Sequence, residues 1–175
     1  MMALPVMTVE QRARVPVKVA EACTARRRWR RLFTCGAVRE NLAMIGHIGI
    51  NVPDLRTAKT YYDSLMPLLG FTEFFTAEDE FAYRPANGKP GTYLFIYPAN
   101  EVSDYSRHRT GLQHVAFMVR SRSVVKEVHE LVTELGATVL HEPRVFPEYP
   151  QPYYATFWLD PFGIMLEAVC HHDRD

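Results

Sequence analysis

Two stretches of the chain combine the apolar residues of a β-strand with a single histidine at the same place. These stretches are IGHIGINV (residues 45–52) and LQHVAFMV (residues 112–119). Successive side chains of a strand point to opposite faces, so His47 is expected to share a face with Gly49, and His114 with Ala116. Both of these small residues leave open space beside the histidine. The opposite faces are wholly apolar and suit packing against helices: Ile48, Ile50 and Val52, and then Val115, Phe117 and Val119.

Each strand is followed by a pattern typical of an amphipathic helix. Asp54 can act as the N-cap of the first helix, and Ser121 or Ser123 as that of the second. The apolar positions at helical spacing are Leu55, Ala58, Tyr62 and Leu65 in the first helix and Val124, Val128, Leu131 and Leu135 in the second. Gly70 and Gly136 are expected to stop the two helices.

Three short β-rich segments follow each helix. They read FTEFFT, EFAYRP and TYLFIYP after the first helix and ATVLHE, YYATFWL and IMLEAV after the second, with turns at NGKPG and DPFG. The chain therefore repeats a β-α-β-β-β unit. This repeat predicts an α+β fold of two βαβββ modules, residues 44–104 and 105–170, within one domain over residues 44–175.

Glu167 is a third polar residue in an apolar strand. It lies in IMLEAV, and a carboxylate in such a setting is costly unless it is paired or bound to a metal. Two imidazoles and one carboxylate form the 2-His-1-carboxylate set, which holds a divalent transition metal and leaves positions open for substrate. We therefore predict that His47, His114 and Glu167 bind a divalent metal ion such as Fe²⁺, Mn²⁺, Ni²⁺ or Zn²⁺.

Composition limits the partners of the chain. Its 175 residues carry no net charge, so neither nucleic acid nor a membrane surface is an expected partner. Three cysteines without a CxxC pair favour a reducing compartment. No apolar run approaches the roughly 18 residues of a membrane span, and the N-terminus lacks the order of a secretory signal. We expect a cytoplasmic protein.

The first 43 residues differ from the rest. They hold eight Arg and one Lys against three Glu, a net charge of +6, which leaves −6 on residues 44–175. Their composition suits an organelle transit peptide or a nucleic-acid-binding arm. The simpler interpretation is an Arg-rich extension, disordered or loosely helical, ahead of a domain that begins at Met44.

The paired modules and the three metal-binding candidates resemble the vicinal oxygen chelate superfamily. The residues that carry the resemblance are His47 in GHIGINVPDL, His114 in LQHVAFMV and Glu167 in LDPFGIMLEAV. The superfamily includes glyoxalase I, extradiol catechol dioxygenases, fosfomycin-resistance transferases and bleomycin-resistance proteins. The resemblance, over residues 44–170, implies a curved mixed sheet around the metal with helices on the outer face. It also implies that the modules pair within one chain or across a homodimer.

The resemblance leaves the reaction open, because one fold hosts several chemistries. Glyoxalases of the superfamily usually have a fourth ligand, a glutamate on the last strand of the first module. Here that strand carries Ile96 and Tyr97 near the expected position, with Glu101 just beyond it. An extradiol dioxygenase also needs an acid–base histidine and a tyrosine beside the metal. His108 and Tyr154 are the candidate catalytic residues for these roles.

Other side chains are available for the same roles, namely His141 and Tyr153. We expect a divalent-metal-dependent enzyme whose small-molecule substrate chelates the metal through vicinal oxygens. Dioxygenase-like chemistry is preferred over a glyoxalase-type lyase or isomerase. The alternative from a different class is a metal-free protein that binds a drug-like ligand, as bleomycin-resistance members do.

Overall fold

The computed structural model describes residues 45–173 and residue 175, so the predicted extension over residues 1–43 lies outside the described residues. The first unit consists of β1 (His47–Val52), α1 (Leu55–Leu65), β2 (Phe71–Thr76), β3 (Phe81–Pro85), the short 3₁₀-helix η3 (Ala86–Gly88) and β4 (Tyr93–Pro98). The second unit consists of β5 (Val115–Met118), α2 (Arg122–Glu134), β6 (Thr138–Val145), β7 (Tyr154–Leu159) and β8 (Met165–Cys170). Both units have the predicted β-α-β-β-β order.

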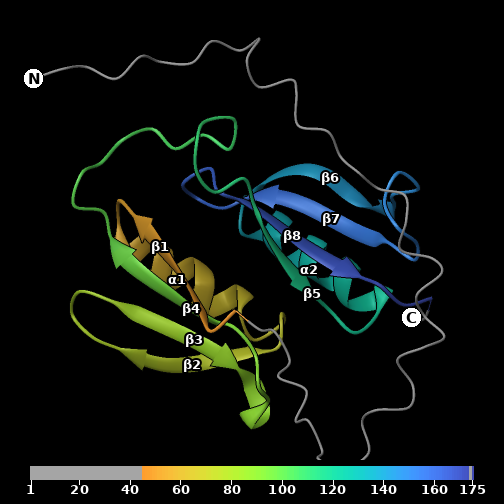
Figure 1. The fold of residues 1–175 in the computed structure, drawn as a ribbon, viewed down its shortest axis with the longest axis horizontal. Helices are drawn as coiled ribbons and strands as arrows, with labels where there is room; N and C mark the ends of the chain where they lie inside the picture. The colour runs from red at the N-terminus through yellow and green to blue at the C-terminus, as the bar shows by residue number, and fades with distance from the viewer. Residues whose placement is uncertain (1–44, 174) are drawn as a thin grey trace, which may run out of the picture. The chain divides into compact units, whose positions relative to one another are not determined.

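Each unit forms its own four-stranded mixed sheet, with the strand orders β1-β4-β3-β2 and β5-β8-β7-β6 (Figure 1). The predicted α+β fold of two βαβββ modules is therefore confirmed. The first strand of each unit pairs in parallel with the last one, which requires a long crossover such as a helix. This pairing makes residues far apart in sequence direct neighbours, as with Ala116 and Glu167.

Burial along the strands follows the predicted alternation. In β1 the side chains of Ile50 and Val52 are buried, whereas His47 is exposed. In β5 Val115 and Phe117 are buried. Each helix lies against the buried face of its own sheet, behind the strands in Figure 1. Within the described residues, neither helix has the length and apolar character needed to cross a bilayer.

The helix boundaries have the predicted local causes. Asp54 is the N-cap of α1, where its carboxylate accepts from the backbone N–H groups of Arg56 and Thr57. Ser121, and not Ser123, caps α2. Gly70 and Gly136 follow the two helices with φ values of 84° and 75°, a conformation that glycine adopts at low cost.

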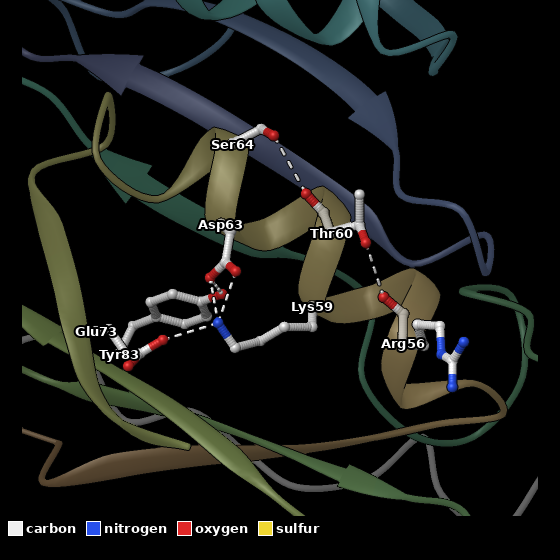
Figure 2. Close-up of polar contacts among 7 residues, drawn as sticks. All are labelled: Arg56, Lys59, Thr60, Asp63, Ser64, Glu73 and Tyr83. Carbon is white, nitrogen blue, oxygen red and sulfur yellow. Dashed lines mark hydrogen bonds and ion pairs between the residues drawn. The ribbon is translucent and has the colours of Figure 1, made fainter. Parts of the chain in front are cut away.

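A charged network fixes α1 over its own sheet (Figure 2). Lys59 Nζ lies 2.6 Å from Asp63 Oδ2 on the same helix and 2.7 Å from Glu73 Oε2 on β2. Tyr83 of β3 donates a hydrogen bond of 2.7 Å to Asp63 Oδ1. Such half-exposed pairs typically stabilise a fold by less than about 1 kcal/mol, so the network orients the helix more than it stabilises it.

The two modules share one hydrophobic core. The helix-covered faces of both sheets contribute to it, and it includes Ile50, Leu94, Val115, Phe117 and Leu166. Polar bonds inside the core join α1 to the second module: Trp158 Nε1 donates to Tyr61 Oη at 2.7 Å. Because the faces opposite the histidines meet in this core, the two histidine faces lie on the sides of the sheets away from it.

The DPFG turn between β7 and β8 is also anchored in this core. Asp160, 5% exposed, accepts from the backbone N–H groups of Phe162 at 2.9 Å and Ile164 at 2.8 Å. Its second oxygen accepts from the Tyr62 hydroxyl of α1 at 3.0 Å. Burial raises the pKa of Asp160 above its ordinary value, although these hydrogen bonds oppose the shift. The motif therefore has a structural role and directs the chain into β8, the strand that carries Glu167.

Candidate metal centre

His114 and Glu167 meet on the face of the second sheet opposite the helix-covered one. Ala116 of β5 is the register partner of Glu167 on β8, and His114 lies two residues before Ala116, on the same face. His114 Nε2 is 3.2 Å from Glu167 Oε2. The His114 side chain is 35% exposed and the Glu167 side chain 1% exposed. A ligand can therefore reach this pair from the histidine side.

The two oxygens of the Glu167 carboxylate have different surroundings. Oε1 accepts a 2.5 Å hydrogen bond from the Tyr153 hydroxyl. Oε2 receives no hydrogen bond from any described residue, because its contact with His114 does not have the orientation of one. Burial raises the pKa of Glu167, while the Tyr153 hydrogen bond and the His114 imidazole oppose that rise. Burial and the neighbouring carboxylate also raise the pKa of Tyr153, so this phenol stays a donor.

The pair has the spacing of two ligands on one metal ion. Two atoms bound at about 2.0–2.2 Å, with about 90–110° between the bonds, lie about 2.8–3.6 Å apart, and the observed separation is 3.2 Å. His114 Nδ1 lies against Gln113 Oε1, a contact that suits the tautomer with the imidazole proton on Nδ1. Nε2 and Oε2 then face each other as two acceptors, an arrangement that a cation between them would stabilise.

His47 does not join this pair within the chain. Among the described residues, no group of three or more His, Cys, Asp or Glu side chains is close enough to hold an ion. The faces of the two sheets that meet in the shared core are the helix-covered ones and not the histidine faces. The structure thus brings together His114 and Glu167 and leaves His47 on the first sheet.

His47 instead lies on an aromatic face of the first sheet. Its ring contacts Phe95 edge-on with 5.4 Å between ring centroids, and Phe95 stacks on Tyr97 at 6.1 Å. A Cβ atom added at Gly49 would lie 3.2 Å from a ring carbon of Tyr97, so glycine lets that ring lie against the strand. This face offers an apolar surface for a flat ligand.

The register of β4 shows which of its side chains lie beside His47. Phe95 and Tyr97 share the face of His47, because Phe95 pairs with Gly49 and Tyr97 with Asn51. Ile96 is fully buried on the core side, so of the two residues named for the position of the fourth glyoxalase ligand only Tyr97 lies on the His47 face. Glu101 is exposed in the loop after β4. The His47 face of this strand therefore carries aromatic rings and no carboxylate.

The two catalytic candidates lie away from the His114–Glu167 pair. His108 is exposed in a turn of the loop between β4 and β5, where its backbone N–H donates to Ser106 Oγ. Tyr154 begins β7 with its ring under the Arg122 guanidinium, 5.3 Å from its centroid. In the described part of the chain, neither side chain contacts His114 or Glu167.

Tyr153, one residue earlier, makes the contact with Glu167 instead. Strand alternation could have identified it. Glu167 pairs with Phe157, so the odd-numbered residues of β7 share the face of Glu167, and Tyr153 continues that series. His141 of β6 pairs with Phe157 of β7, which in turn pairs with Glu167 of β8. The ring centroids of His141 and Phe157 are 5.6 Å apart.

Comparisons with known proteins agree with the fold described above. A family model described as the Glyoxalase/Bleomycin resistance protein/Dioxygenase superfamily matches residues 44–168. The uncharacterized protein YqjT of Bacillus subtilis (strain 168) is 30% identical over 126 residues, 70% of this chain and 95% of that protein.

Solved structures with the same fold include a candidate glyoxalase from Bacillus halodurans, with a TM-score of 0.64 and 30% identity over 74% of this chain and 96% of that one. A glyoxalase/bleomycin resistance protein from Albidiferax ferrireducens T118 has a TM-score of 0.61 at 21% identity and covers 74% and 100% of the two chains. The fosfomycin resistance protein FosX from Listeria monocytogenes has a TM-score of 0.55 at 17% identity and covers 75% and 96%. The last two likenesses show the fold alone.

Proposed function

Because the chain belongs to the glyoxalase/bleomycin resistance protein/dioxygenase superfamily, we propose that it is a divalent-metal-dependent enzyme whose small substrate chelates the metal through vicinal oxygens. The observation that carries this proposal is the buried Glu167 carboxylate, whose free oxygen lies 3.2 Å from His114 Nε2. Two acceptors at that distance suit a metal ion held by both residues.

The third ligand in this proposal is His47 of a second copy of the chain. Each copy offers one helix-free face with His47 and another with His114 and Glu167, and the three side chains are not brought together among the described residues of one copy. In a symmetric dimer, the first sheet of each subunit can cover the second sheet of the other. Such a dimer contains two equivalent sites, each built from both subunits.

The residues around the site have defined roles in this proposal. A bound divalent ion would supply a Lewis acid that polarises the chelated oxygens of the substrate. Tyr153 holds Oε1 of Glu167, so that Oε2 stays directed at His114. The aromatic face with Phe95 and Tyr97 excludes water and stacks on a flat substrate. His141 is the acid–base candidate, because it is the register partner of Phe157, which is the register partner of Glu167.

Dioxygenase-like chemistry is favoured over glyoxalase isomerisation for a specific reason. The strand that would supply the glutamate base of a glyoxalase presents Phe95 and Tyr97 beside His47. A three-ligand site leaves room for a bidentate substrate and one further ligand. The aromatic face of the first sheet also supports a second candidate function, a protein that binds an aromatic drug-like ligand without chemistry.

An activity comparison tests these alternatives. We expect Fe²⁺-loaded protein to convert at least one member of a panel of catechols, measured as oxygen uptake. Turnover of methylglyoxal–thiol hemithioacetals by the Ni²⁺- or Zn²⁺-loaded protein, without turnover of catechols, would favour the glyoxalase reaction. Inactivity on both substrates, together with tight binding of aromatic ligands to the metal-free protein, would favour the binding protein.

We expect Tyr153→Phe to weaken metal binding about 10–100-fold, the usual effect of removing a partner that orients a ligand. The hydroxyl is lost while the ring and its packing remain. The dissociation constant can be measured by competition with a chromogenic chelator. Tyr154→Phe is the matched control, because that tyrosine points to the other side of β7. Equal metal affinity of Tyr153→Phe and wild type would show that Tyr153 does not orient Glu167.

A further inference from the structure

Arg107 lies at one edge of the proposed metal site. It belongs to the loop between β4 and β5, is half-buried, and directs Nη1 to the sulfur of Met165 at 3.1 Å. Met165 is the first residue of β8. Glu167 lies two residues later on the same face of the strand, so the two Cα atoms are about 6.6 Å apart. Val115 of β5 pairs in parallel with Leu166 of β8. The residues directly before them, His114 and Met165, are therefore neighbours as well. The guanidinium is thus beside the strand ends that carry the metal-binding pair.

This guanidinium has no acidic partner among the described residues. None of the ion pairs formed within residues 45–173 includes Arg107. Its polar contact is a thioether, which is a weak acceptor for one of the five N–H donors of the group. Residues 44–175 carry a net charge of −6, so the absence of an ion pair between Arg107 and any described carboxylate is a local feature. The remaining donors are available to a ligand.

A second cation lies at the opposite end of the same face. Arg144 pairs in register with Ala155 and stacks over the Phe146 ring, 4.1 Å from its centroid. Phe146 in turn packs edge-on against Phe157 at 5.2 Å. The floor of this face is therefore apolar and aromatic, and its polar groups are mainly cationic or neutral apart from Glu167.

We propose that Arg107 binds a carboxylate of the substrate, so that the substrate is a small organic acid that also chelates the metal. This inference rests on the proposed function. A divalent ion with two neutral imidazoles and one carboxylate keeps one positive charge, and Arg107 adds another. An anionic substrate would neutralise both, and the planar guanidinium fork matches a carboxylate in two parallel hydrogen bonds.

The test compares two probes that differ in one charge. Zn²⁺-loaded protein is titrated calorimetrically with 3,4-dihydroxybenzoate and with 3,4-dihydroxybenzamide, which present the same vicinal oxygens. We expect the acid to bind about tenfold or more tightly than the amide, the usual strength of a charged hydrogen bond. In Arg107→Gln the ratio of the acid affinity to the amide affinity should fall to about one, with zinc affinity unchanged. Arg109→Gln is the matched control, because Arg109 is exposed on the same loop and donates to the Asp104 carbonyl.

Three outcomes would overturn the inference: equal affinity of the wild type for both probes, an acid preference that survives in Arg107→Gln, or no binding of either probe. Failure of the proposed function has a different signature, because the wild type would then take up no zinc. The comparison of the two probes on the metal-free protein would still report whether Arg107 selects the acid.

Discussion

A heterodimer of His47→Ala and His114→Ala subunits should recover metal binding that neither variant has alone. Each homodimer lacks a ligand in both of its sites. In the heterodimer one site loses both histidines, while the other takes His47 from the His114→Ala subunit and His114 from the His47→Ala subunit. One intact site of two predicts about half the metal content of the wild-type dimer. Both histidines are at least partly exposed, so their removal leaves the core unchanged.

The measurement uses two different affinity tags on co-expressed subunits, purification through both tags, and elemental analysis. The control heterodimer combines His114→Ala with Glu167→Ala. These two ligands come from the same chain, so each of its sites lacks one and its metal content should stay near zero. Metal-free samples of both heterodimers, with a metal-replete wild type, would contradict a site shared between subunits. A wild type that binds no metal would contradict the proposed function itself.

Asp160→Ala should cause the largest loss of stability of the changes considered for this chain. The substitution leaves three donors without their acceptor, namely the buried Ile164 N–H and Tyr62 hydroxyl and the part-buried Phe162 N–H. A buried donor without a partner costs about 1–3 kcal/mol, so we expect the free energy of unfolding to fall by about 3–5 kcal/mol. Urea denaturation monitored by circular dichroism measures this change.

Two variants control for this loss of stability. Asp79→Ala removes an exposed carboxylate on the loop between β2 and β3 and should change stability by less than about 0.5 kcal/mol. Asp160→Asn keeps an oxygen for the two backbone N–H groups and should lose less than Asp160→Ala. A loss below about 1 kcal/mol in Asp160→Ala would show that solvent replaces these bonds and that the turn does not depend on them.

The fold was largely predictable because its causes are local. Apolar alternation identified the buried side of β1 and β5, and capping and stop residues such as Asp54 and Gly136 marked the helix ends. These signals act within a few residues of one another, so they can be recognised along the chain. Even here Ser121 and Ser123 were equivalent candidates, and the backbone geometry of the strand end selected Ser121.

The candidate site was predictable in composition but not in assembly. Alternation alone placed His47, His114 and Glu167 on the faces opposite the helices, because side-chain direction within a strand is a local property. Which of these faces meet depends on how the modules pack, and among the described residues of one chain the three side chains do not come together.

Contacts across the fold decided the remaining features. Tyr153 rather than Tyr154 holds Glu167 because the pairing of β7 with β8 sets which tyrosine faces the carboxylate. Arg107 reaches the site through a loop contact with Met165, 58 residues later in the sequence. The sequence by itself thus determined the two modules and the chemistry of their faces. Only the tertiary structure decided which side chains meet, because packing and register join residues that no local pattern connects.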